Sequence, residues 1–287
     1  MINCKTIEQL RSQIKTWREN NETIAFVPTM GGLHAGHLSL VELAKQKATR
    51  VVVSIYVNPF QFSPDEDFSS YPRTLTEDLE KLQLIDTDLV FLPTNEMIYP
   101  QGEQQSVFAD VPNLSNIIEG EFRPSFFRGI ATVVLKLFNM VQPDYAVFGE
   151  KDFQQLLIIK RLVKDLFLPI EILAGPTKRE HDGLAMSSRN NYLTATERDN
   201  SRLLSETLKQ MRAAINARAG VAEVENEAIK TLVSAGFLVD YLTLCETSGL
   251  NTMSNADIVV GKELIILAGA KLGKTRLIDN LKFVVTD

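Results

Sequence analysis

The sequence predicts an α/β fold built on a parallel sheet, followed by a smaller α+β domain. The apolar run of residues 24–28 is typical of a buried parallel strand, and residues 38–48 then carry apolar side chains at helical spacing. Residues 50–58, rich in β-branched side chains, complete a strand–helix–strand unit whose crossover should be right-handed. After Thr194 long polar helices precede the strands, so the even alternation of strand and helix ends there.

Composition limits the classes of protein to consider. A chain of 287 residues can bury roughly three-quarters of its unfolded surface, enough for the two domains that we expect. The formal net charge of −6 argues against a nucleic-acid backbone as the main partner. Cys4 and Cys245 are too few and too far apart for a disulfide framework or a thiolate metal site. With no signal-peptide pattern and no apolar run of roughly 20 residues, we expect a cytoplasmic protein without a membrane span.

The elements of the first domain follow from apolar spacing and turn residues. Apolar residues on one face of 6–20 predict a helix that lies on the sheet, and two prolines within 58–64 end the second strand. The mixed pattern of 95–121 indicates only short strands or turns. We further expect helices over 75–84, 129–140 and 156–166, and strands over 88–92, 145–148 and 170–173.

The second domain is predicted to contain two helices and three strands. We expect the helices over 195–217 and 222–235, and the strands over 240–245, 263–268 and 275–278. The polar loop of residues 175–191 is a plausible hinge before this domain. Residues 269–275 resemble the end of a P-loop but are one residue short and precede a strand, so we interpret them as a turn between strands.

The turn of residues 29–37 is the strongest candidate for chemistry. Its three glycines let the backbone bend sharply and approach a ligand, and the start of the following helix favours an anion such as phosphate. His34 and His37 could form half of a zinc site, pack in the core or hold phosphate. Zinc needs further ligands, and His181 is the only other imidazole. Packing is disfavoured among glycines at a helix start, so phosphate binding is the favoured interpretation.

Two further segments are weak when each is considered alone. Residues 149–152 follow a strand and could be an ordinary solvated helix start, or Lys151 could point at phosphate. Residues 186–189 form a serine-containing stretch that is most simply a linker. Neither segment alone selects a function.

Together, these segments resemble a known family. Residues 34–37 match the H-x-G-H box of the nucleotidylyltransferase superfamily, and residues 186–189 are similar to the mobile phosphate loop of the related tRNA synthetases. Five stretches closely resemble the pantothenate synthetase family, namely 28–37, 57–62, 71–74, 148–155 and 182–189. The resemblance covers about residues 24–191 and continues more loosely to 277–280.

The resemblance implies a fold and an activity. Members of this family join pantoate to β-alanine: pantoate attacks the α-phosphorus of ATP with Mg²⁺, giving pantoyl adenylate and pyrophosphate, and the β-alanine amine then displaces AMP. The fold would be a Rossmann-like parallel sheet domain of the H-x-G-H type, residues 1–178, that binds ATP and pantoate. Residues 179–287 would form a smaller C-terminal lid domain. A homodimer is also implied.

The resemblance also assigns residues to ATP. His37 would be the catalytic proton donor to the leaving group, with His34 beside it on the phosphates. Lys151 would hold phosphate oxygens, Lys178 would contact adenine through its backbone, and residues 186–189 would close on the triphosphate. The full predicted ATP set is Met30, Gly31, Gly32, Leu33, His34, Ala35, Gly36, His37, Gly149, Glu150, Lys151, Asp152, Lys178, Met186, Ser187, Ser188 and Arg189.

Substrate and metal contacts complete the expectations. Gln61 and Gln155 would bind pantoate, since amides can both donate to and accept from a hydroxy acid. Asn58 and Tyr71 are lesser candidates. No protein ligand to Mg²⁺ is assigned, because the metal is commonly held mainly by substrate phosphates. Glu77 and Asp78 are considered as ligands, but a helix face of carboxylates is more often simply solvated.

One departure from the family pattern is visible. Relatives usually have Gly-His where this chain has Ser125 and Phe126, which puts any catalytic role of that segment in doubt. Two other functions stay open: another nucleotidylyltransferase that adenylates a phosphorylated cofactor precursor, and a nucleotide-binding protein without catalysis. A tRNA synthetase is disfavoured by the acidic balance and by the lack of room for an anticodon domain.

Overall fold

The computed structural model describes residues 1–63 and 66–286, and the chain divides into two compact units. Unit 1 comprises Met1–Glu150 and Gln155–Pro176, and unit 2 comprises Lys151–Gln154 and Thr177–Asp287. The short stretch 151–154 therefore belongs by its contacts to the second unit, although it lies within the sequence of the first.

Unit 1 is built on the predicted parallel sheet. In the described part of the chain this sheet has six strands, all paired in parallel, in the order β1-β4-β3-β2-β5-β6. They are β1 (Ile2–Cys4), β2 (Ile24–Thr29), β3 (Arg50–Ile55), β4 (Leu89–Phe91), β5 (Tyr145–Gly149) and β6 (Glu171–Gly175). The strand order reverses between β2 and β5, and in open α/β sheets the crevice at such a point binds ligands.

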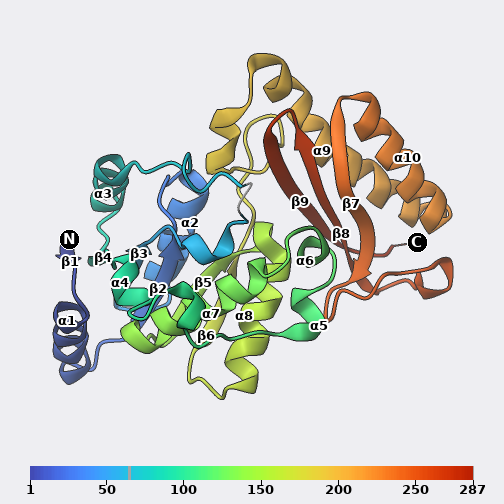
Figure 1. The fold of residues 1–287 in the computed structure, drawn as a ribbon. Coiled ribbons are helices and arrows are strands. Elements are labelled where there is room, and N and C mark those ends of the chain that lie inside the picture. Colours follow the sequence, from blue (N-terminus) through green and yellow to red (C-terminus); the bar gives the residue numbers. More distant parts are fainter. Residues whose placement is uncertain (64–65, 287) are drawn as a thin grey trace. The chain divides into compact units, whose positions relative to one another are not determined.

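Helices of unit 1 surround or connect the strands (Figure 1). They are α1 (Ile7–Glu19), α2 (Ala35–Lys45), α3 (Leu75–Leu84), α4 (Asn95–Ile98), α5 (Pro112–Ser115), α6 (Glu119–Phe122), α7 (Phe126–Val141) and α8 (Phe153–Asp165), whose first residues lie in unit 2. Short 3-10 turns occupy Pro59–Gln61, Glu103–Gln105 and Glu150–Asp152. The prediction of only short strands or turns over 95–121 was wrong, because α4, α5 and α6 are single helical turns, too short to show a periodicity.

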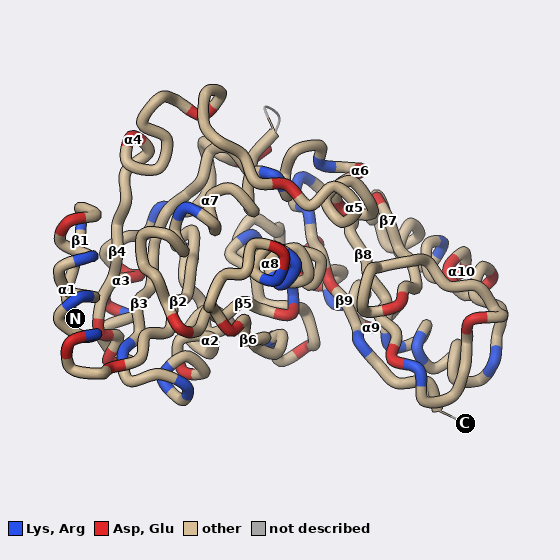
Figure 2. The backbone as a smooth tube through the Cα atoms, turned by 90° about the horizontal axis from the view of Figure 1, so that it is seen from below, with Lys and Arg blue, Asp and Glu red and all other residues tan. Residues whose placement is uncertain are grey.

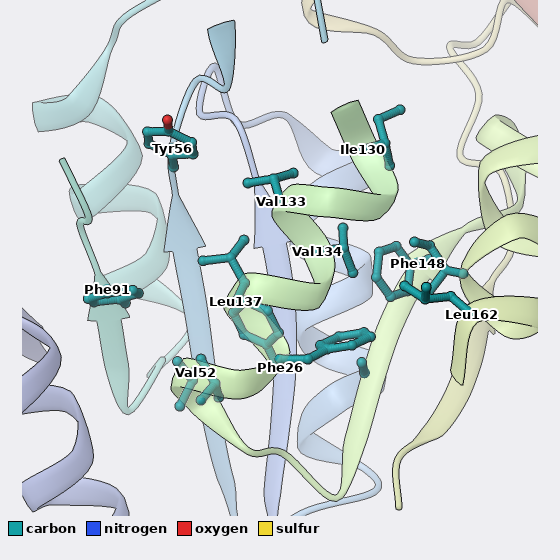
Figure 3. Close-up of a cluster of buried hydrophobic side chains, with 14 of the residues drawn as sticks. Phe26, Val52, Tyr56, Phe91, Ile130, Val133, Val134, Leu137, Phe148 and Leu162 are labelled. Carbon is teal, nitrogen blue, oxygen red and sulfur yellow. The ribbon is translucent and has the colours of Figure 1, made fainter. Parts of the chain in front are cut away.

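The two faces of the sheet carry separate cores. Along β2, Ile24 and Phe26 belong to the cluster that also contains α7, whereas Ala25 and Val27 belong to the cluster with α2. Figure 3 shows α7 lying across the first face, with its valine and leucine side chains toward Phe26 and the neighbouring strands. Burial on both faces explains why these strands are continuously apolar in the sequence.

Three helices begin earlier than predicted. Helix α2 begins at residue 35 against a predicted 38, α7 at 126 against 129, and α8 at 153 against 156. Their first turns contain glycine or polar residues, such as Gly36 and Gln154, that interrupt the apolar spacing. The shift matters for α2, because it places His37 inside the helix and not in the preceding loop.

Unit 2 is the predicted smaller α+β unit. Strands β7 (Phe237–Glu246), β8 (Glu263–Leu272) and β9 (Thr275–Val284) form an antiparallel sheet in that order. Helices α9 (Ala195–Asn216) and α10 (Val221–Ser234) share one apolar core with it, and short 3-10 turns occupy Ser188–Tyr192 and Asn255–Asp257. Of the P-loop-like residues 269–275, the first four end β8, the last begins β9, and 273–274 form the predicted turn between these strands.

Charge is distributed over both units. Acidic and basic residues are interspersed along the backbone of each (Figure 2). Within the described residues, no helix combines the length and the apolar character that crossing a membrane requires.

Candidate active site

The turn after β2 has the sharp bend that its glycines predict. Gly31 and Gly32 have φ values of 81° and 61°, in the left-handed region that favours glycine. The hydroxyl of Thr29, the last residue of β2, donates to the carbonyl of Ser54 at 2.8 Å and so fixes the start of the turn on β3. A Cβ atom on Gly31 would lie 3.0 Å from Oδ2 of Asp78, so the turn is also tightly enclosed.

Asp78 of α3 binds the backbone of this turn. The N–H groups of Gly32 and Leu33 donate to Oδ2 and Oδ1 of Asp78 at 2.9 and 2.8 Å. Asp78 is only 1% exposed, whereas its neighbour Glu77 is exposed. The interpretation of both carboxylates as a solvated helix face was therefore wrong for Asp78, whose charge is buried and satisfied by amides.

His34 and His37 cap helix α2 reciprocally. The N–H of Gly36 donates to Nδ1 of His34 at 3.1 Å, and the N–H of His34 donates to Nδ1 of His37 at 3.3 Å. The ring centroids are 4.1 Å apart. Because each Nδ1 accepts a hydrogen bond, we assign the hydrogen of the neutral form of each ring to Nε2, where it suits an anionic acceptor. Among the described residues, no group of three or more potential metal ligands surrounds these histidines.

Gln61 lies beside the glycine turn. Its Nε2 donates to Sδ of Met30 at 2.8 Å, and Nδ2 of Asn58 donates to its Oε1 at 3.3 Å. Asn58 is 1% exposed and accepts a 2.8 Å hydrogen bond from the Tyr99 hydroxyl. The buried Asn58 thus holds the Gln61 side chain, and Gln61 in turn contacts Met30 of the turn.

A helical glycine sets the position of the Gln61 loop. A Cβ atom on Gly129 of α7 would lie 2.5 Å from the carbonyl oxygen of Phe60 and 3.1 Å from the nitrogen of Gln61. Nδ2 of Asn58 also donates to the Gly129 carbonyl at 3.3 Å. Apolar spacing identified α7 as a core helix, but it carried no sign that this glycine lets the loop pack directly on the helix.

The segment that departs from the family pattern also supports this loop. Arg123 donates to both carboxylate oxygens of Glu66 at 2.6 Å and to the carbonyl of Gln61 at 3.3 Å. Its guanidinium carbon lies 3.4 Å from the ring centroid of Phe126. Phe126, which departs from the expected family pattern, therefore stacks on the arginine of this partly buried ion pair.

Ser125 provides a first testable prediction, on stability. Its φ of 69° and ψ of −4° are left-handed, a conformation that costs an L-residue roughly 1–2 kcal/mol and glycine almost nothing. We expect Ser125→Gly to raise the free energy of unfolding by about 0.5–1 kcal/mol, because the relieved strain exceeds the extra entropy of unfolded glycine. Urea denaturation measures this difference. Ser125→Ala, which keeps the Cβ atom, should bring no gain, and a less stable glycine variant would contradict the argument.

In unit 2, strand β9 anchors two of the predicted ATP-binding segments. Asp279 accepts two hydrogen bonds from the guanidinium of Arg179, at 2.7 and 2.9 Å. The next residue, Asn280, donates through Nδ2 to the carbonyl of Lys151 at 2.8 Å. The loop that leads to residues 186–189 and the backbone of Lys151 are thus attached to consecutive residues of one strand.

The predicted polar loop before α9 has regular hydrogen bonds within unit 2. The N–H of Glu180 donates to the carbonyl of Leu184 at 2.8 Å, and that of Met186 donates to the carbonyl of Lys178 at 3.0 Å, so residues 178–186 form a hairpin. Ser187 then caps the 3-10 turn Ser188–Tyr192, accepting from the N–H of Arg189 at 3.3 Å. The side chain of Lys178 is exposed.

Each unit therefore gathers part of the predicted site. Unit 1 brings together the glycine turn, the histidine pair and Gln61, while Gly149 ends β5 beside β2 and Gln155 lies half-buried on α8. Unit 2 brings together Lys151 and the hairpin that precedes residues 186–189. No sequence signal pointed to Asp78, Gly129 or Asn280 as supports, because their partners lie far away along the chain.

Known proteins are similar to this chain over its whole length. A family model described as Pantoate-beta-alanine ligase matches residues 2–282. A pantothenate synthetase of Shewanella amazonensis is 50% identical over 283 residues, and one of Shewanella sp. (strain ANA-3) is 49% identical, each alignment covering 99% of both chains.

Solved structures agree with the family match. A pantothenate synthetase from Thermus thermophilus has a TM-score of 0.91 and 41% identity, with all of both chains covered. The Francisella tularensis pantoate-beta-alanine ligase, complexed with beta-gamma ATP and beta-alanine, has a TM-score of 0.82 and 36% identity, covering 98% of this chain and 97% of that one.

Proposed function

The chain belongs to the pantoate-beta-alanine ligase family, and from that premise we propose that it joins pantoate to β-alanine, converting ATP to AMP and pyrophosphate. The observation that carries the proposal lies in unit 1, where the histidine pair, the glycine turn and Gln61 meet after β2. That place is the strand end at which the sheet order reverses.

In the first step, a pantoate carboxylate oxygen would bond to the α-phosphorus of ATP while the bond from that phosphorus to pyrophosphate breaks. Transfer at phosphorus needs positioning and charge neutralisation more than covalent help. Nε2–H of His37 would donate to the leaving pyrophosphate, with His34 on the phosphates. Gln61 and Gln155 would hold pantoate, because their amides can donate to and accept from a hydroxy acid.

In the second step, the β-alanine amine would attack the acyl carbon of pantoyl adenylate. The new C–N bond forms as the bond from the acyl carbon to the AMP oxygen breaks, and the amine loses a proton. We place β-alanine near Gln61. Lys151 and residues 186–189, from unit 2, would bind the phosphates of ATP, and Lys178 would meet adenine through its backbone.

Mg²⁺ would be bound mainly by the ATP phosphates, whose charge it neutralises. One observation supports this assignment: both oxygens of Asp78 already accept backbone hydrogen bonds. We further propose, from the family resemblance alone, a cytoplasmic homodimer in which residues 1–178 bind ATP and pantoate and residues 179–287 act as a lid.

The direct test is product formation by the purified chain. With ATP, Mg²⁺, pantoate and β-alanine we expect AMP and pyrophosphate in equal amounts and a product with the mass of pantothenate. Omission of pantoate or of β-alanine should each abolish steady AMP release. AMP release that persists without either substrate would refute the proposal. A stable dinucleotide would indicate the alternative nucleotidylyltransferase, and ATP binding without turnover would indicate a non-catalytic homologue.

A further inference from the structure

Helix α3 holds the glycine turn through one acceptor and one donor side chain. Asp78 accepts from the N–H groups of Gly32 and Leu33, at 2.9 and 2.8 Å. One turn further along α3, Nζ of Lys81 donates to the carbonyl of Leu33 at 2.8 Å. The peptide groups immediately before His34 are therefore fixed from two points on one helix.

The local geometry is built around the Asp78 carboxylate. Each of its oxygens accepts one backbone N–H, and Oδ1 lies 3.3 Å from the hydroxyl of Thr74. Successive N–H groups around residues with left-handed φ form a concave site for an anion, and here the anion is a side chain of the same chain. Gly31 leaves room for it, since a Cβ atom there would lie 3.0 Å from Oδ2.

Strand β2 and helix α2, which flank the glycine turn, are held in place by other contacts. Strand β2 is paired with β3 and β5, and Val41 and Ala44 of α2 lie in the apolar cluster on that face of the sheet. The turn between them has glycine at two positions and depends on α3 for its exact place. Loss of Asp78 should therefore displace the turn, and with it the start of α2, more than it disturbs the fold.

We propose that Asp78 is a positioning residue: its buried carboxylate sets the glycine turn so that His34 and His37 present Nε2–H to the phosphates. This inference rests on the proposed ligase function. Asp78 acts through the backbone amides, not as a ligand to Mg²⁺. A misplacement of about 1 Å at a reacting group can cost on the order of 10²-fold in rate, which sets the scale of the expected effect.

The test is Asp78→Asn, with Glu80→Gln as the matched control. The asparagine keeps one acceptor but presents an NH₂ donor to the second amide, so one of the two hydrogen bonds is lost. We expect kcat to fall about 10- to 100-fold, KM for pantoate to change less than about threefold, and the Mg²⁺ concentration for half-maximal activity to stay unchanged. Glu80, exposed on the same helix, loses the same charge and should leave all three values unchanged.

Two further measurements keep the test decisive. Amide NMR should show altered shifts and faster hydrogen exchange for Gly32 and Leu33 in Asp78→Asn, and this result does not depend on any activity. If the wild-type chain fails as a ligase, the proposed function fails while these signals still report whether Asp78 holds the turn. Lys81→Met, which leaves the buried carboxylate in place, should also lower kcat several-fold. If Asp78→Asn does not fold, this second variant tests the proposal in its place.

Two results would overturn the inference. One is a folded Asp78→Asn enzyme with kcat within twofold of the wild type, or unchanged kcat in Lys81→Met when only that variant folds. The other is a rise in the Mg²⁺ concentration required by Asp78→Asn, because that would make Asp78 a metal ligand.

Discussion

Replacement of His37 by alanine is expected to lower kcat on the order of 10²-fold or more. The reason is the loss of the Nε2–H donor that we assign to the leaving pyrophosphate, and removal of a single positioned donor at a developing charge typically costs this much. Steady-state release of AMP measures kcat, with pantoate, β-alanine and ATP all saturating. Turnover equal to that of the wild type would refute the role given to His37.

The same histidine also has a structural role, which needs its own control. Nδ1 of His37 accepts from the N–H of His34 at the start of α2, so His37→Ala should also lose about 0.5–1 kcal/mol of stability. Glutamine is a natural residue at this position of a capping box. We therefore expect His37→Gln to recover stability but not turnover. Full recovery of activity in that variant would mean that capping is the only role of His37.

The amount of fold that the sequence could predict depended on element length. Strands β2 and β5 and helices α1, α3 and α7 carry apolar side chains at positions dictated by two buried sheet faces, and each was predicted within a few residues. Strand β1 was missed because three residues cannot display a period. The early start of α2 was missed because its cap is made by histidines, which are not the usual capping residues.

The sequence could likewise predict only some residues of the candidate site. The residues to which we assign chemistry lie within short motifs, so the sequence could indicate His34 and His37 from the glycine turn itself and Gln61 through the family resemblance. Their supports could not be predicted, because Asp78 and Gly32 are 46 residues apart and Asn58 and Gly129 are 71 apart. Without those pairings, a buried carboxylate such as Asp78 is indistinguishable from a solvated one, and a glycine in a core helix has no evident purpose.

Gly129→Ala is expected to lower stability and to displace the Gln61 loop. The added Cβ would lie 2.5 Å from the Phe60 carbonyl oxygen, a backbone atom that cannot rotate away, so α7 and the loop must separate. Overpacking of this kind costs typically about 1–3 kcal/mol, against roughly 1 kcal/mol gained from the higher helix propensity of alanine. We therefore expect a net loss of up to about 2 kcal/mol in urea denaturation.

Gly129→Ala should also weaken the binding of pantoate, an effect that a loss of stability alone would not produce. Gln61 is tied to the displaced loop, so we expect KM for pantoate to rise about tenfold while KM for ATP changes little, provided that assays are run where the variant is folded. Asn139→Ala, at an exposed position on the same helix, is the matched control and should alter neither KM nor lower stability. A stable Gly129→Ala enzyme with unchanged KM for pantoate would show that Gln61 is positioned independently of α7.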